Sequence, residues 1–213
     1  MSEKIIHIGE ATTPRFEFRT FGHNFTDYHN KMAELSLPVP DEMRVRKFDE
    51  IYIISKTVDD TNIKVKNNKL DVKKLIQVRD NLEKWNTMMK FDFPVSKKLL
   101  MDEIFPALKA DILLLKNNAL DEKQFVDIIK RHKDLLVIPV LKKRYAYILN
   151  YTICEFAEVI FGNDCLYTVS VESTEAEEVT KTIQELNLDS LENINYVQAI
   201  KRVNNIISKP LAN

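Results

Sequence analysis

The chain has 213 residues, of which 45% are hydrophobic and 30% are charged, and its formal net charge is −1 at pH 7. This length allows one large domain or two small ones, and the composition is that of an ordinary globular protein. A net charge near zero gives no general reason to expect binding to nucleic acid or to an anionic membrane, so any charge-based function has to come from a local arrangement.

The first predicted strand covers residues 14–21 and carries an unusual charged face. Side chains alternate across a strand, so Arg15, Glu17 and Arg19 share one face while Phe16 and Phe18 lie on the other. Aromatic residues favour strands over helices. Three ionisable groups in a row are more than an ordinary solvated face needs, and the same pattern returns later in the chain.

A short helix and a second strand follow. Residues 28–35 carry apolar side chains at helical spacing, and the helix is expected to stop before Pro38. The basic residues 44–47 are interpreted as a solvated connector that could guide an anion. The run 49–55 is rich in β-branched and aromatic residues and predicts a strand.

The next strands form a basic hairpin. Residues 62–66 and 69–76 are separated by Asn67-Asn68, a pair suited to a tight turn with positive φ. Residues 82–90 predict a further strand with a polar face. Cations line one side of these strands, and Trp85 is expected to belong to the core.

The hydrophobic period becomes helical from Ser96. Ser96 and Asp121 are expected to be N-caps, and Pro106 separates two helices, the second of which continues through residues 108–115. No Gly/Pro/Ser-rich linker flanks residues 96–132, so we interpret them as a helical insertion on one sheet rather than an independent domain.

Strand patterns resume after the insertion. Residues 135–149, 151–161 and 166–173 predict three strands. An amphipathic helix over 175–188, capped by Ser173 or Thr174, and a last helix over 191–207 form a C-terminal helical segment, 174–208.

At least seven strands joined mostly by short turns favour an α+β fold with an antiparallel sheet or barrel. Such sheets usually have one solvated face, so solvated charges are the simplest explanation of the alternation. If a barrel turns the charged faces inward, however, its basic lining would bind a polyanion, and nearby carboxylates could hold a divalent cation.

Several motifs share an order that resembles a known family. They are the charged strand 14–21, the strand 49–55, Lys64-x-Lys66 with Leu70-Asp71-Val72-Lys73, Lys142-Lys143-Arg144, Cys154-Glu155-Phe156, and residues 169–173 ahead of a helix. This order is similar to that of the CYTH superfamily, or triphosphate tunnel metalloenzymes, over about residues 13 to 188. The resemblance implies a single CYTH-like domain over 1–213. It also implies an eight-stranded antiparallel tunnel with a basic interior for triphosphate and Glu-bound Mg²⁺ or Mn²⁺.

The motifs depart from the family pattern in their acids. The opening Glu-x-Glu-x-Lys corresponds to Arg15-Phe16-Glu17-Phe18-Arg19, and the closing Glu-x-Glu to Ser170-Val171-Glu172. Lys64-x-Lys66 replaces Arg-x-Arg, which keeps the charge but loses the bidentate fork. Each acidic strand retains one carboxylate, so phosphate binding is better preserved than a two-metal site.

The resemblance gives one main hypothesis and leaves two alternatives open. The main hypothesis is an enzyme that binds and hydrolyses a small-molecule triphosphate or polyphosphate with Mg²⁺ or Mn²⁺. Its metal ligands would be Glu17, Glu172 and Glu155, and Lys142 and Arg144 would act in catalysis. Its phosphate-binding residues would be Arg19, Lys64, Lys66, Lys73, Lys142 and Arg144. The alternatives are a non-catalytic phosphate- or nucleotide-binding module on the same fold, and an interaction protein that works through residues 96–132.

Other features carry little functional information. The histidines show no metal-ligand spacing, and three glycines leave little room for a phosphate-binding loop. Cys154 and Cys165 are expected to be reduced, packed thiols. No stretch approaches the ~20 apolar residues of a membrane span and the N-terminus has no long apolar core, so we expect a cytoplasmic protein without a membrane partner.

Overall fold

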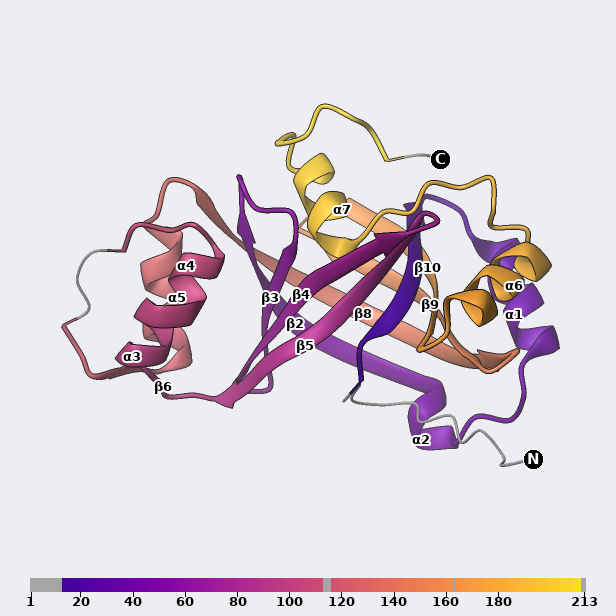
Figure 1. Cartoon of the computed structure of the whole chain (residues 1–213), viewed down its shortest axis with the longest axis horizontal. Helices are drawn as coiled ribbons and strands as arrows, with labels where there is room; N and C mark the ends of the chain where they lie inside the picture. Colours follow the sequence, from indigo (N-terminus) through magenta and orange to yellow (C-terminus); the bar gives the residue numbers. More distant parts are fainter. Residues whose placement is uncertain (1–12, 113–115, 163, 212–213) are drawn as a thin grey trace.

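The structure is a computed structural model that describes residues 13–112, 116–162 and 164–211. Eight strands close into an antiparallel barrel in the order β1-β10-β9-β8-β2-β3-β4-β5 (Figure 1). The barrel strands are β1 (Arg15–Gly22), β2 (Val45–Ser55), β3 (Thr61–Lys66), β4 (Lys69–Arg79), β5 (Leu82–Asp92), β8 (Leu135–Leu149), β9 (Thr152–Phe161) and β10 (Asp164–Ser173). The predicted α+β fold with an eight-stranded antiparallel barrel is confirmed. The assignment of 1–213 to one domain stays a prediction.

Two local features explain the register of β2, β3 and β4. Asn67 and Asn68 adopt φ angles of 51° and 57° in the β3–β4 hairpin, as their residue types predict. Strand β2 begins at Val45, because β8 supplies it with partners from Tyr145 onwards. The expectation of a connector over 44–47 is therefore wrong for residues 45–47, which are strand residues.

The helical insertion packs on the outside of the barrel. It contains the short strands β6 (Val95–Ser96) and β7 (Ala119–Leu120), the helices α3 (Lys97–Leu99), α4 (Phe105–Ala107) and α5 (Glu122–Lys130), and the π-helical turn η1 (Leu100–Ile104). Figure 1 shows this segment at the opposite end of the molecule from α1 and α6. Phe105 and Phe125 pack with Ile63 and Leu70 of the barrel in one buried cluster, so the insertion is anchored through apolar contacts.

The caps of the insertion are as predicted, but one of its helices is not. The Ser96 side chain accepts a hydrogen bond from the Leu99 amide, and Asp121 forms a capping box with Gln124. The helix predicted over 108–115 is wrong in its described part, residues 108–112. Helix α4 ends at Ala107, and Lys109 has a left-handed φ of 52° that breaks the helical path. Leu115 of that prediction lies outside the described residues.

Helices α1 (Thr26–Leu35), α2 (Asp41–Arg44) and α6 (Ala176–Leu186) lie away from the insertion. Phe16 and Phe18 of β1 are buried with Met32 of α1 and Val179 of α6, so the apolar face of β1 points outward and its charged face points into the barrel. Helix α6 begins at Ala176 with Glu175 as its N-cap residue, so the predicted cap at Ser173 or Thr174 is wrong.

Helix α7 (Tyr196–Val203) is shorter than the predicted 191–207. The preceding residues are held by β1 instead, since the Ile194 amide donates to the Arg19 carbonyl and the Asn193 side chain accepts from the Arg19 amide. Tyr196 and Ile200 are buried with Tyr52 and Val140 of the barrel in one cluster. The part of the barrel interior next to α7 is therefore filled by apolar side chains, and the charged side chains line the rest of the interior.

Both cysteines are free, as predicted, but only Cys154 is buried, whereas Cys165 is exposed. Within the described ranges, no helix has the length and apolar character needed to cross a membrane.

Candidate functional site

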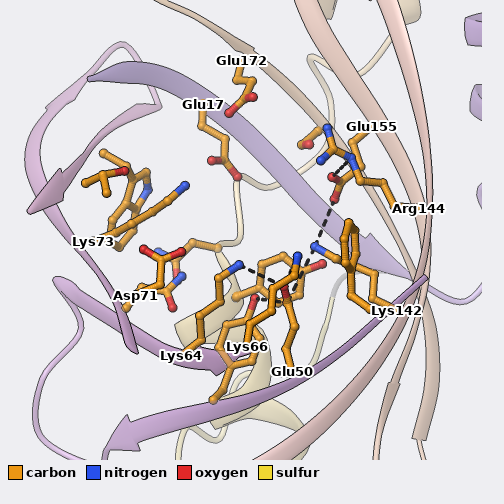
Figure 2. A pocket seen from close by; sticks show the side chains of 18 of the residues that line it. Glu17, Glu50, Lys64, Lys66, Asp71, Lys73, Lys142, Arg144, Glu155 and Glu172 are labelled. Carbon is orange, nitrogen blue, oxygen red and sulfur yellow. Dashed lines mark hydrogen bonds and ion pairs between the residues drawn. The ribbon is translucent and has the colours of Figure 1, made fainter. Parts of the chain in front are cut away.

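A cavity of about 840 Å³ lies inside the barrel. All nine residues that the sequence singled out line it: Glu17, Arg19, Lys64, Lys66, Lys73, Lys142, Arg144, Glu155 and Glu172. They come from strands β1, β3, β4, β8, β9 and β10, and Figure 2 labels all of them except Arg19. The charged alternation therefore marks an enclosed surface and not a solvated face, although the roles of the nine residues stay predictions.

The cavity carries an excess of positive charge. Among its described lining residues are nine Lys or Arg side chains and five Asp or Glu side chains, which is a surplus of four positive charges. The whole chain, by contrast, has a net charge of −1. The surplus is therefore a property of the barrel interior, and such a lining attracts and retains anions.

One part of the lining is the lysine group, which we define as Lys64, Lys66, Lys142 and Glu50. Glu50 Oε1 lies 3.1 Å from Lys64 Nζ and 3.3 Å from Lys66 Nζ. Glu50 Oε2 lies 4.0 Å from Lys142 Nζ. Burial alone would raise the pKa of Glu50, but the charges of Lys142, Lys64 and Lys66 outweigh it and lower this pKa to about 2. Glu50 is therefore ionised at neutral pH.

The second part is the arginine group, defined as the lining residues Arg19, Arg144, Glu17, Glu155 and Glu172 together with Arg15, which is paired with Glu172. Glu155 lies 3.0 Å from Arg19 Nη1 and 2.8 Å from Arg144 Nε. Arg19 Nε also lies 2.5 Å from Glu17 Oε1. Burial would raise the pKa of Glu155, but the charges of Lys142, Arg19 and Arg144 lower it well below its usual range. Glu155 is therefore ionised at neutral pH and is paired with both arginines.

The partners of the three predicted metal ligands decide whether a cation fits. Glu17 and Glu172 face each other across the β1–β10 ladder, but Glu17 is paired with Arg19 and Glu172 lies 2.9 Å from Arg15 Nη1. Among the residues that the structure describes, no three His, Cys, Asp or Glu side chains gather closely enough to hold a metal ion. An adjacent guanidinium repels a divalent cation. In this arrangement the acids do not fit a resident Mg²⁺ or Mn²⁺.

Sequence reasoning missed several lining residues. Glu50 was missed because it precedes the run 51–54, which is apolar at every position and hides which face turns inward. Arg46, Lys69 and Lys90 also line the cavity. Counting back in steps of two from Tyr52 would have found Arg46 and Glu50, because alternate residues share a face.

Trp85 is buried, as expected of a core residue, but it also lines the cavity. Its Nε1 donates a hydrogen bond to Glu83 Oε2 at 3.0 Å. Asn195, the residue before α7, donates to both oxygens of Glu83. Burial raises the pKa of Glu83 despite these hydrogen bonds. These contacts link the cavity wall to the C-terminal helix.

Comparisons with known proteins identify the fold through solved structures. No family model matches the chain, and no curated protein matches it. A Bacillus halodurans protein described as a candidate adenylate cyclase is 12% identical, with 85% of this chain and 94% of that chain covered and a TM-score of 0.51. A conserved hypothetical protein from Pyrococcus furiosus is 15% identical, with 86% and 98% covered and a TM-score of 0.49.

A third similar structure is a candidate adenylyl cyclase from Hippeastrum, described as having a dominant triphosphatase activity. It is 10% identical, covers 82% of this chain and 87% of its own, and has a TM-score of 0.43. At these identities the likeness concerns the fold. Together with the strand order of the closed barrel, the match to the Bacillus halodurans protein shows that this chain has the CYTH-like fold.

Proposed function

We propose that the cavity binds the triphosphate group of a small molecule, either an inorganic tripolyphosphate or polyphosphate, or an organic or nucleoside triphosphate. The observation that carries this proposal is the surplus of four positive charges in the cavity of a chain whose net charge is −1. Lysine and arginine donate strong charge-assisted hydrogen bonds to phosphate oxygens. The predicted phosphate-binding residues Arg19, Lys64, Lys66, Lys73, Lys142 and Arg144 all have access to this space.

Hydrolysis of the bound triphosphate is a second candidate activity. It is favoured by Glu17 and Glu172, which face the cavity from directly opposite positions of neighbouring strands. Lys142 and Arg144 would stabilise charge on the transferred phosphoryl group, since this chemistry depends on positioning and electrostatics. Because Glu17 and Glu172 are paired with arginines, Mg²⁺ or Mn²⁺ would enter the cavity bound to the polyphosphate. The pairing of these acids with arginines also favours the simpler function, which is binding without hydrolysis.

Thermal stabilisation by tripolyphosphate tests the binding proposal. Lys142→Ala and Lys143→Ala remove the same charge from adjacent positions of β8. Lys142 lines the cavity, whereas Lys143 is half-exposed and lies 3.8 Å from Glu158. In EDTA, tripolyphosphate is expected to raise the melting temperature of wild type and Lys143→Ala, and to raise that of Lys142→Ala much less. Equal stabilisation of both variants, or none of wild type, would contradict the proposal.

Phosphate release separates hydrolysis from binding. Wild type and Glu172→Ala are incubated with tripolyphosphate, nucleoside triphosphates or thiamine triphosphate, in Mg²⁺, Mn²⁺ or EDTA. Metal-dependent release that is lost in Glu172→Ala supports hydrolysis. Stabilisation without release under any of these conditions assigns the cavity to binding alone.

A further inference from the structure

Glu50 lies at the centre of the lysine group because of its strand's position. Strand β2 lies between β8 and β3, so an inward side chain on β2 can reach lysines from both neighbours. The Glu50 side chain has no solvent exposure, and its two oxygens are shared among Lys64, Lys66 and Lys142. Glu50 Oε2 also accepts a hydrogen bond from Tyr52 Oη at 3.4 Å. Every polar atom of this carboxylate is therefore used within the protein.

Lys64 and Lys66 depend on this one carboxylate, whereas Lys142 also lies 3.9 Å from Glu155 Oε1. Three like charges held this close repel each other. Burial, together with the charges of Lys64 and Lys142, lowers the pKa of Lys66 to about 8 against the attraction of Glu50. The ring of Phe48 lies 3.3 Å from Lys66 Nζ, which fixes the ammonium on a second side.

We propose that Glu50 is a positioning residue of the cavity, whose buried carboxylate holds Lys64, Lys66 and Lys142 together as one anion-binding group before the ligand arrives. This inference rests on the proposed triphosphate function. One carboxylate among three ammonium groups leaves two positive charges for the ligand. The carboxylate itself is unexposed, so a bound phosphate meets the ammonium groups from the cavity side.

Other ionisable groups lie around the lysine group. Tyr52 on the same strand and Tyr196 on α7 have pKa values raised well above their ordinary value by burial, so both stay neutral. Asp71 on β4 lies opposite Lys64 in the β3–β4 ladder and also faces the cavity. Arg46 shares the ring of Phe48 from β2 at 5.3 Å. Lys66 is the group whose titration near pH 8 reports on Glu50.

The test is the affinity for tripolyphosphate of wild type and Glu50→Gln, measured by calorimetry in EDTA at fixed ionic strength from pH 6 to pH 8.5. The ligand also titrates, so the ratio of the two dissociation constants is taken at each pH. If losing Glu50 lowers the pKa of Lys66 from about 8 by roughly one unit, and binding requires Lys66 to be protonated, the ratio of variant to wild-type dissociation constant rises about sevenfold from pH 6 to pH 8.5. A purely structural role of Glu50 would shift the ratio equally at every pH.

Matched variants complete the experiment. Glu158→Gln makes the same change on the outer side of the barrel, where Glu158 is 42% exposed, and its ratio is expected to stay constant. Glu50→Asp keeps the negative charge but places it farther from the lysines, because the side chain is one methylene shorter. The ratio of its dissociation constant to that of wild type should therefore rise about twofold to threefold from pH 6 to pH 8.5. If Glu50→Gln does not fold, Glu50→Asp alone decides. A pH-independent ratio with intact wild-type binding overturns the role of Glu50, whereas absent wild-type binding overturns the proposed function.

Discussion

The lysine group and the arginine group contain equal numbers of cations but differ in charge balance. In the lysine group, three ammonium groups share the carboxylate of Glu50. In the arginine group, three guanidinium groups face three carboxylates at 2.5 to 3.0 Å. Arginine's planar fork suits fixed pairing with carboxylates, whereas lysine is a point charge on a flexible stem. We infer that the arginine group mainly stabilises the barrel, and that the lysine group supplies most of the charge that attracts an anion.

Lys142 connects the two groups. Its Nζ lies 4.0 Å from Glu50 Oε2 and 3.9 Å from Glu155 Oε1, and its side chain is 9% exposed. A ligand phosphate that contacts Lys142 therefore lies between the charge-balanced arginine group and the positively charged lysine group.

The largest effect is expected from Glu155→Gln, which breaks the arginine group at its centre. Glu155 is 6% exposed, and its loss leaves Arg19 and Arg144 without their shared counter-ion. Removing one member of a buried ion pair costs about 3–5 kcal/mol. Denaturant unfolding is the measurement, with Glu158→Gln on the same strand as the exposed control. A loss no greater than that of the control would mean that the arginine group is not structural.

The next effect is the acid dependence of stability that Glu50 provides. The pKa of Glu50 falls from 4.5 to about 2 on folding, so its contribution is present above pH 4.5 and is lost as the pH falls towards 2. The contribution amounts to about 3 kcal/mol. The difference in unfolding free energy between wild type and Glu50→Gln should therefore shrink between pH 5 and pH 2. A constant difference would show that Glu50 is not held ionised by its lysines.

Most of the barrel and its lining could be predicted from the sequence, because alternation is a local property of a strand. Arg15, Glu17 and Arg19 alternate with Phe16 and Phe18, and this pattern gives the face of β1 without any tertiary information. Closure of the barrel was an assumption at that point. It turned a charged face into an enclosed lining, and only the strand order of the structure establishes it.

The parts that could not be predicted depend on contacts between distant segments. Residues 191–195 carry a helical pattern, yet the Ile194 amide bonds to the carbonyl of Arg19 and delays α7 to Tyr196. The pairing of Glu17 and Glu172 with arginines also requires the register of β1 and β10. Local spacing predicted carboxylates near a basic lining, but it contained no information on which cation would pair with each carboxylate.

A smaller effect is expected from Glu17→Gln. Its sign shows whether Glu17 only pairs with Arg19 or holds a metal ion. If Glu17 serves only to pair with Arg19, removing its charge makes the cavity more positive and tightens tripolyphosphate binding in EDTA about threefold. If Glu17 holds a metal that the ligand needs, the variant weakens binding in Mg²⁺. Calorimetry with and without Mg²⁺ measures both, and weaker binding in Mg²⁺ alone would restore the predicted metal site.

The smallest effect is expected at the rim of the cavity. Lys69 lines the cavity, but in its pair with Asp92 the two side chains are 46% and 74% exposed. Solvent and salt screen such a charge, since the Debye length is about 8 Å at physiological ionic strength. Lys69→Ala should weaken tripolyphosphate binding less than about threefold at low salt, and the difference should vanish at about 0.5 M salt. Lys64→Ala should keep a clear loss at both, because Lys64 is 19% exposed and lies against the buried Glu50. Equal, salt-sensitive losses for the two variants would mean that the ligand stays at the rim and does not reach the lysine group.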